Sequence, residues 1–246
     1  MSALGVKVLG SGNAFNQDNR LNSSYIIELK GKKILIDCGF TTPFALQKNN
    51  IPSNEIDFVL ITHYHGDHFA GLSAFLLALN YTSPQKKQLV IIGAEDVEQK
   101  VYDLVKTLYP GSEKIIKTLD INFQAITKKM ILGEIILESI PMIHSTASLP
   151  FGVVINFDSH KIGFSGDTSW HEGVECLIDK SDYVFLECNL AKKVGKGHIS
   201  VEELEESELV QAKKAQIYLT HLSDVSCVLA LEKGYKCISD GDYFTF

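Results

Sequence analysis

Three histidines and an aspartate lie within six positions of this chain, directly after an apolar run. The cluster reads His63-Tyr64-His65-Gly66-Asp67-His68, and the run before it is Phe58-Val59-Leu60-Ile61. An apolar run of this kind predicts a buried strand, which would deliver the polar side chains to one point. Neutral imidazole suits zinc, and a nearby carboxylate suits a second, harder cation or a ligand that two cations share. The cluster therefore indicates a metal site rather than a polar loop.

Three more residues that suit a metal follow predicted strands further along the chain. His144 follows a strand expected at residues 135–143, Asp167 follows one at 161–164, and His221 follows one at 216–219. A lone histidine after a strand is more often a structural or surface residue than a ligand. Three such residues in a chain that already carries the opening cluster favour a ligand role, because a two-metal site needs more ligands than that cluster supplies.

The elements that must position these residues are hairpins followed by mixed strands and helices, in two successive halves. Strands are expected at residues 6–9, 24–29, 33–37, 57–61, 88–92, 121–126, 134–143, 151–157, 161–164, 183–187, 216–219, 236–239 and 243–246. Helices are expected at residues 43–49, 67–79, 94–108, 200–209 and 226–231, with Asp67 as the N-cap of the second. The pattern favours two sheets face to face with helices outside, in a single domain over residues 1–246.

Bulk properties narrow the class of protein. Hydrophobic residues make up 45% of the chain, which is enough for a substantial core, and no apolar run approaches the length of about 18 residues that a membrane span needs. The start, Met1-Ser2-Ala3-Leu4-Gly5, lacks the pattern of a secretory signal. Five scattered cysteines without a paired motif favour reduced thiols in a cytoplasm. The net charge of −7 argues weakly against a dedicated nucleic-acid surface.

The candidate ligands resemble a known motif when they are taken in their order along the chain. All seven positions of the dinuclear motif of the metallo-β-lactamase superfamily are matched, by His63, His65, Asp67, His68, His144, Asp167 and His221. The resemblance covers nearly the whole chain, and it implies an α/β (α+β) fold in the form of a four-layer αββα sandwich. Asp37, in a segment that resembles the early strand of that fold, would support the ligands from behind.

The resemblance also implies how the ligands divide between two divalent cations. His63, His65 and His144 would hold one cation, and Asp67, His68 and His221 would hold the other. Asp167 would bridge the two cations. Zinc is the first choice, although a set of histidines and carboxylates also admits manganese or iron. Two cations about 3.5–4 Å apart would hold a bridging hydroxide that attacks the substrate.

Within the superfamily, the chain resembles the ribonuclease Z-like branch. Gly197-His198-Ile199-Ser200 lies between Asp167 and His221, and Glu187 ends the strand before it. In that branch such a histidine donates a proton to the leaving group while the glutamate orients it, so His198, Glu187 and Asp67 are the expected catalytic residues. The alternative is that His198 merely belongs to the loop that caps the helix at residues 200–209.

One departure from that branch concerns the substrate. True ribonuclease Z enzymes carry a long arm that grips tRNA between the positions of His144 and Asp167. Here twenty-two residues, 145–166, separate the two, and predicted strands fill them. The chain therefore looks closer to small cyclic phosphodiesterases that act on a small anionic substrate. Nucleic acid as a substrate is disfavoured but left open, as is a homodimer, because many relatives are dimers.

Other functions stay open at this point. The same hydroxide could open a lactone or thioester, where His198 would matter less because the leaving group needs no proton. A non-catalytic binder that has kept the site is disfavoured by the intact ligands, and a tRNA 3′ endonuclease would need a surface from a partner. Lys192, Lys193 and Lys196 precede His198, and they are either a solvated loop, which charge runs usually are, or a basic lip that receives an anion.

Overall fold

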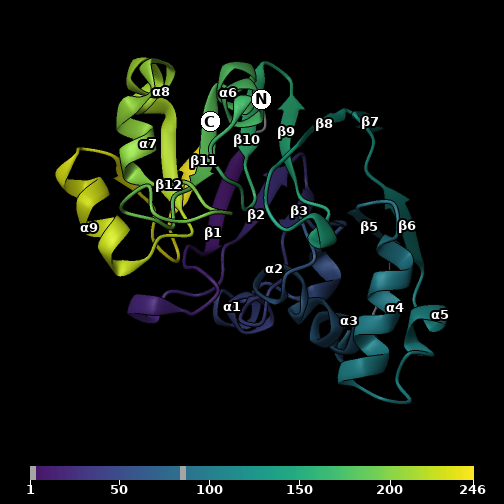
Figure 1. Ribbon diagram of the computed structural model, residues 1–246. Helices are drawn as coiled ribbons and strands as arrows, with labels where there is room; N and C mark the ends of the chain where they lie inside the picture. The colour runs from purple at the N-terminus through teal and green to yellow at the C-terminus, as the bar shows by residue number, and fades with distance from the viewer. Residues whose placement is uncertain (1–3, 84–86) are drawn as a thin grey trace. The chain divides into compact units, whose positions relative to one another are not determined.

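The computed structural model describes residues 4–83 and 87–246, and these fold into two compact units (Figure 1). Unit 1 comprises Met1–Gly10, Leu21–Ala125 and Asp240–Phe246, and unit 2 comprises Ser11–Arg20 and Ile126–Ser239. The first three residues of the chain, on which the expectation of no secretory signal partly rests, lie outside the described residues. The single domain over residues 1–246 stays a prediction.

Unit 1 is built on a mixed sheet with the strand order β14-β1-β2-β3-β4-β5-β6. The strands are β1 (Gly5–Gly10), β2 (Ser24–Leu29), β3 (Lys32–Ile36), β4 (Phe58–Leu60), β5 (Leu89–Gly93), β6 (Ile121–Ala125) and β14 (Tyr243–Thr245). Pairing is antiparallel from β14 to β3 and parallel from β3 to β6. The β2–β3 hairpin turns at Lys30 and Gly31, which both have positive φ, as a tight two-residue turn between twisted strands requires.

Helices cover this sheet with apolar side chains that recur at helical spacing. They are α1 (Thr42–Lys48), α2 (Gly66–Phe69), α3 (Gly71–Thr82), α4 (Val97–Leu108) and α5 (Ile115–Thr118), with the 3₁₀ turn η2 (Ser53–Glu55). Leu72, Phe75 and Leu76 of α3 and Val101 of α4 pack in one buried cluster with strand residues such as Val59. This cluster anchors the end of β4, which leads directly into the histidine motif.

Unit 2 repeats the plan with the strand order β13-β12-β11-β10-β9-β8-β7. The strands are β7 (Lys129–Leu132), β8 (Ile135–Pro141), β9 (Phe151–Phe157), β10 (His160–Phe164), β11 (Tyr183–Glu187), β12 (Ile217–Thr220) and β13 (Lys236–Cys237). Pairing is antiparallel from β7 to β10 and parallel from β10 to β13. Because β8 and β10 both run antiparallel to β9, the carboxyl ends of β8, β10, β11 and β12 meet at one edge of the sheet.

The helices of unit 2 begin at well-formed caps. They are α6 (Glu172–Lys180), α7 (Val201–Glu206), α8 (Glu208–Lys213) and α9 (Asp224–Glu232), beside the 3₁₀ turns η1 (Gln17–Asn19), η3 (Thr146–Ser148) and η4 (Lys214–Gln216). Ser200 and Glu203 form a reciprocal capping box at α7, and Ser223 forms one with Ser226 at α9. In the part of the chain that the structure describes, no helix is both long and apolar enough to cross a membrane.

The structure corrects several local predictions. Asp67 is not an N-cap, because His65 holds that position with extended backbone angles and Asp67 lies in the first turn of α2. The helix expected at residues 67–79 is two helices, α2 and α3, and the one expected at 200–209 breaks at Ser207, whose backbone is extended. The segments β7, α5 and α6 were not expected.

Candidate metal centre

The cluster at the end of β4 is gathered in unit 1 as the sequence predicts. The ring centroid of His63 lies 4.8 Å from that of His65 and 4.2 Å from that of His68. His68 Nε2 lies 3.3 Å from Oδ2 of Asp67, and both side chains are buried. The extended backbone of His65 followed by the helical turn of α2 places the four side chains together. Imidazole and carboxylate groups packed this closely in a buried position suit a cation.

Asp37, at the end of β3, holds the cluster from behind. Its Oδ1 accepts the backbone N–H of Thr62 at 2.7 Å, and its Oδ2 accepts the Thr62 hydroxyl at 2.8 Å and Nδ1 of His68 at 2.7 Å. Burial raises the pKa of Asp37, whereas His68 and Thr62 act in the opposite direction. The Asp37 backbone lies in the left-handed region, at φ 57°, which aspartate adopts more readily than most other non-glycine residues.

The residues after Asp37 dock against the helical turn that carries Asp67 and His68. The backbone N–H of Cys38 donates to the carbonyl oxygen of His68 at 2.7 Å. A Cβ on Gly39 would collide with the backbone of Asp67, so glycine is needed for this close approach. The turn is therefore held by backbone contacts as well as by the Asp37 carboxylate.

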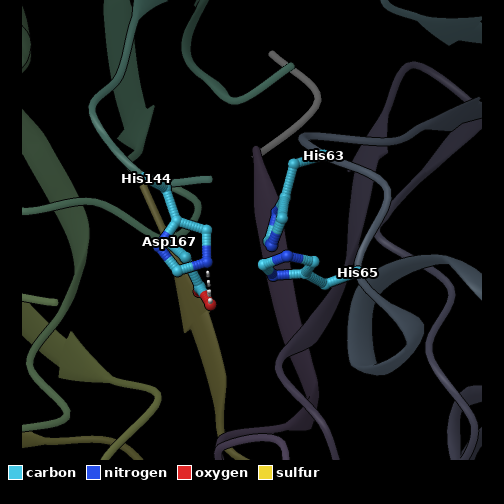
Figure 2. A group of neighbouring side chains, drawn as sticks. All are labelled: His63, His65, His144 and Asp167. Carbon is cyan, nitrogen blue, oxygen red and sulfur yellow. Dashed lines mark ion pairs between the residues drawn. The ribbon is translucent and has the colours of Figure 1, made fainter. Parts of the chain in front are cut away.

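The other three candidate ligands are gathered in unit 2. Oδ2 of Asp167 lies 3.9 Å from His144 Nε2 and 3.3 Å from His221 Nε2. Figure 2 draws His63 and His65 of unit 1 with His144 and Asp167 of unit 2, and its dashed line marks the ion pair between His144 and Asp167. Each of the three residues follows the carboxyl end of a strand, β8, β10 or β12, so the shared sheet edge brings them together. The backbone of His221, at φ 54°, also lies in the left-handed region.

His198 joins this group through Glu187. Nδ1 of His198 lies 2.9 Å from Oε1 of Glu187, which is fully buried. The backbone N–H groups of Thr168 and Asn189 donate to the same carboxylate at 2.9 and 3.1 Å, and they fix it in place. The His198 ring lies 5.0 Å from the His144 ring and 5.3 Å from the His221 ring, between centroids. Glu187, His198 and His221 each offer one ligand atom, all within 4.8 Å of one another.

The donor chemistry and spacing fit divalent cations. Two ligands that each lie about 2.1 Å from a tetrahedral zinc are about 3.4 Å apart. The nitrogen-to-oxygen separation is 3.3 Å both for His68 with Asp67 and for His221 with Asp167. Nδ1 of His68 is held by a carboxylate, and Nδ1 of His144 lies 2.7 Å from the carbonyl oxygen of Gly197. Metal-binding histidines are usually held in this way through the ring nitrogen that does not bind the metal.

The nearby thiols have a different character. Burial raises the pKa of Cys38, next to Asp37, and of Cys188, next to Glu187, and the neighbouring carboxylates add to the effect. Burial therefore favours the protonated form of both thiols.

Sequence reasoning missed several residues that support the site. Thr168, Ser169 and Asn189 act through hydrogen bonds that only the folded chain shows, although each follows a candidate ligand or Glu187 within two residues. The half-buried His171 accepts the N–H of Gly173 at 3.1 Å and caps α6. Lys192, Lys193 and Lys196 are all exposed.

Comparison with known proteins places this arrangement in a family. The Anti-Pycsar protein Apyc1 family matches residues 4–236. An Anti-Pycsar protein Apyc1 from Saccharibacillus brassicae is 26% identical over 226 residues, 90% of this chain and 90% of that protein. A ribonuclease Z from Alkaliphilus oremlandii is 35% identical over 116 residues, 46% of this chain but only 36% of that enzyme.

Solved structures show the same fold. The metallo-beta-lactamase fold protein YhfI from Bacillus subtilis matches with a TM-score of 0.79 over 100% of both chains, at 21% identity. The predicted α+β metallo-β-lactamase fold and the kinship with ribonuclease Z are thus confirmed. The histidine and aspartate clusters of the chain suit divalent metals. The chain belongs to the Anti-Pycsar protein Apyc1 family and has the metallo-β-lactamase fold.

Proposed function

We propose that this chain is a dinuclear metal-dependent phosphodiesterase that acts on a small phosphodiester or cyclic phosphate. The observation that carries the proposal is the buried Glu187 carboxylate on Nδ1 of His198, with the His198 ring beside His144 and His221. An oriented imidazole next to candidate metal ligands is the group that a reaction with a poor alkoxide leaving group needs.

The ligand roles follow the family motif. His63, His65 and His144 are assigned to one cation, and Asp67, His68 and His221 to the other, with Asp167 shared. Zinc is the first candidate because the set is rich in imidazole and the nitrogen-to-oxygen separations suit a tetrahedral ion. When bound, the two cations supply an activated water and neutralise charge on the phosphate oxygens. Metal analysis of the purified protein, with zinc, manganese and iron compared, tests both the number and the identity.

His198 is assigned the role of general acid. The Glu187 carboxylate only accepts when it is ionised, so Nδ1 of His198 carries a proton and the ring is held in one orientation. A protonated ring can then donate from Nε2 to the departing oxygen while Glu187 stabilises its positive charge. A positioned acid of this kind is worth about 10²–10⁴-fold in rate. Asp67, which lies against His68 in the first turn of α2, is assigned to both metal binding and catalysis.

The carbonyl-hydrolase alternative makes less use of this geometry. A thioester releases a thiolate, which departs without a proton, so its hydrolysis does not require a buried carboxylate dedicated to one histidine. A tRNA endonuclease would also make full use of His198, but this chain lacks the tRNA-gripping arm between His144 and Asp167. The short shared length with ribonuclease Z, 36% of that enzyme, also keeps its activity a secondary candidate.

A substrate panel on the metal-loaded protein tests the proposal. The panel holds bis-p-nitrophenyl phosphate, cyclic nucleotides, a thioester and a precursor tRNA. We expect hydrolysis of the phosphodiesters that chelator abolishes and added zinc restores. Hydrolysis of the thioester alone would defeat the proposal, and cleavage of the precursor tRNA alone would move it to the endonuclease alternative.

His198→Ala separates the general acid from a ligand. We expect full metal content and a rate loss that grows as the leaving group becomes poorer. His160→Ala is a matched control, because His160 begins β10 at its turn with β9 and is not among the clustered histidines. Loss of metal in His198→Ala would instead assign His198 to a cation with Glu187 and His221.

A further inference from the structure

We propose that Gly197 is a positioning residue that aims both His144 and His198 from a single backbone position. The inference rests on the proposed function and deepens it, because it concerns how the ligand His144 and the acid His198 are oriented relative to each other. Gly197 directly precedes His198 in the chain, and its carbonyl oxygen lies 2.7 Å from Nδ1 of His144.

The first part of the argument is the orientation of His144. A carbonyl oxygen only accepts hydrogen bonds, so Nδ1 of His144 carries a proton, and in the neutral ring Nε2 carries the lone pair. Nε2 is the atom that lies 3.9 Å from Oδ2 of Asp167. The Gly197 carbonyl therefore selects the tautomer of His144 that presents its lone pair on the side of Asp167.

The second part is the tether that holds Gly197 itself. Its backbone N–H donates to Oγ of Ser169 at 2.8 Å. The backbone N–H of Ser169 donates to the carbonyl oxygen of Ile143 at 2.7 Å, immediately before His144. Ser169 thus hydrogen-bonds to both segments that meet in the His144–Gly197 hydrogen bond.

The third part links the tether to His198. Thr168, next to Ser169, donates its backbone N–H to Oε1 of Glu187, the same oxygen that accepts Nδ1 of His198. The segment from Asp167 to Ser169 therefore carries one candidate ligand, fixes the carboxylate behind the acid and anchors Gly197. Gly197 therefore links the orientation of the His144 ring to that of the His198 ring.

Only glycine fits at this position. The backbone φ of Gly197 is 93°, in the region that L side chains rarely adopt, and a Cβ there would lie 3.0 Å from Nδ1 of His144. A side chain would therefore strain the backbone and press on the ring it should orient. Gly195 offers a matched control two residues earlier, because a Cβ there would first meet a terminal methyl group of Leu190 at 3.1 Å.

The test compares Gly197→Ala with Gly195→Ala in the full chain, by two measurements that do not depend on turnover. Long-range proton–nitrogen NMR on the metal-free, histidine-labelled protein reports the His144 tautomer, and competition with a chromogenic chelator reports zinc affinity. We expect Gly197→Ala to lose the single Nδ1–H tautomer and to bind zinc about 10–100-fold more weakly, the usual loss when a group that orients a ligand is altered. We expect Gly195→Ala to match wild type. Equal tautomer and zinc affinity in the two variants would overturn the proposal.

A second variant keeps the test decisive if Gly197→Ala does not fold. Ser169→Ala removes the tether without adding an atom near His144, and we expect it to weaken zinc binding and broaden the His144 signals. Unchanged zinc affinity and signals in Ser169→Ala would count against the proposal. If wild type shows no phosphodiesterase activity, the proposed function fails, while the tautomer and zinc comparisons still decide the role of Gly197.

Discussion

Nδ1 of His68 lies 2.7 Å from Oδ2 of Asp37, and both side chains are buried in unit 1. The contact leaves Nε2 of His68 on the side of Asp67, 3.3 Å from its Oδ2. Asp37 therefore does for His68 what the Gly197 carbonyl does for His144. The His68 ring is oriented by a carboxylate and the His144 ring by a backbone carbonyl. Only the carboxylate places a negative charge next to the ring.

This difference predicts that Asp37→Asn weakens metal binding while the fold is kept. The amide is nearly isosteric, but it removes the charge that makes the His68 ring a more basic ligand. We expect zinc affinity to fall by about 10–100-fold, as measured by competition with a chromogenic chelator. Asp57→Asn is a matched control, because Asp57 is a buried aspartate of the same unit whose partners are lysines rather than a histidine. Zinc affinity that is equal in the two variants would remove Asp37 from the site.

Glu187→Gln should impair protonation of the leaving group rather than metal binding. Glu187 accepts from His198, Thr168 and Asn189, so an amide in its place must turn a donor toward at least one of these N–H groups. We expect a loss of turnover, greater for poor than for good leaving groups and smaller than the roughly 10²–10⁴-fold that a whole acid is worth. A leaving-group series of phosphodiesters measures this. A loss of equal size across the series would show that Glu187 acts on something other than His198.

The strand ends that carry the candidate ligands are predicted well from the sequence because apolar residues change to polar ones within one or two positions. The apolar run before His63, and those before Asp167 and His221, each end in polar residues that a buried strand cannot hold. The ligands of the first cluster are also close together in the sequence, and the others fall at positions of a family motif. Their placement was therefore expected within a few residues, and the structure gathers each group within its own unit.

Contacts between distant segments could not be predicted in the same way. Nothing near Gly197 in the sequence points to His144, because the two are fifty-three positions apart and are joined by a backbone carbonyl. The strand Lys129–Leu132 was missed because its apolar run, Met130-Ile131-Leu132, is only three residues long. The helix Glu172–Lys180 was a miss of a different kind, since Val174, Leu177 and Ile178 recur at helical spacing but its cap is His171 rather than a residue typical of helix starts.

The lysines before His198 should have little influence on substrate binding. Lys193 lies 3.5 Å from Glu206, and Lys192 and Lys196 are exposed to solvent, where charges are screened over about 8 Å at physiological salt. We expect a variant with all three changed to alanine to keep the wild-type preference between a charged and a neutral ester, as judged by kcat/KM for each. A selective loss on the charged ester, absent from a variant with Lys193→Ala alone, would instead make Lys192 and Lys196 a basic lip.

Asp57 should stabilise unit 1 in a way that depends on pH. Its Oδ2 accepts the backbone N–H of Lys33 at 3.0 Å, and its Oδ1 lies 3.0 Å from Nζ of both Lys32 and Lys87. Burial acts to raise the pKa of Asp57, but these three partners outweigh it and the pKa is lowered. The two lysines are about half exposed, so each ion pair contributes only about 0.2–1 kcal/mol to stability. The backbone hydrogen bond from Lys33 supplies much of the rest of the stabilisation by Asp57.

A lowered pKa fixes the sign of the pH dependence. The folded state favours ionised Asp57, so its contribution to the free energy of unfolding is fully present above the unfolded pKa of about 3.9. That contribution is lost as the pH falls through the lower folded pKa. Asp57→Asn should therefore be less stable than wild type by about 1–3 kcal/mol at pH 7, and the difference should shrink once the pH drops below about 4. Urea unfolding of metal-free protein across this range, followed by circular dichroism, measures it. A difference that stays constant down to the lowest pH would show that the variant acts through packing rather than through the charge of Asp57.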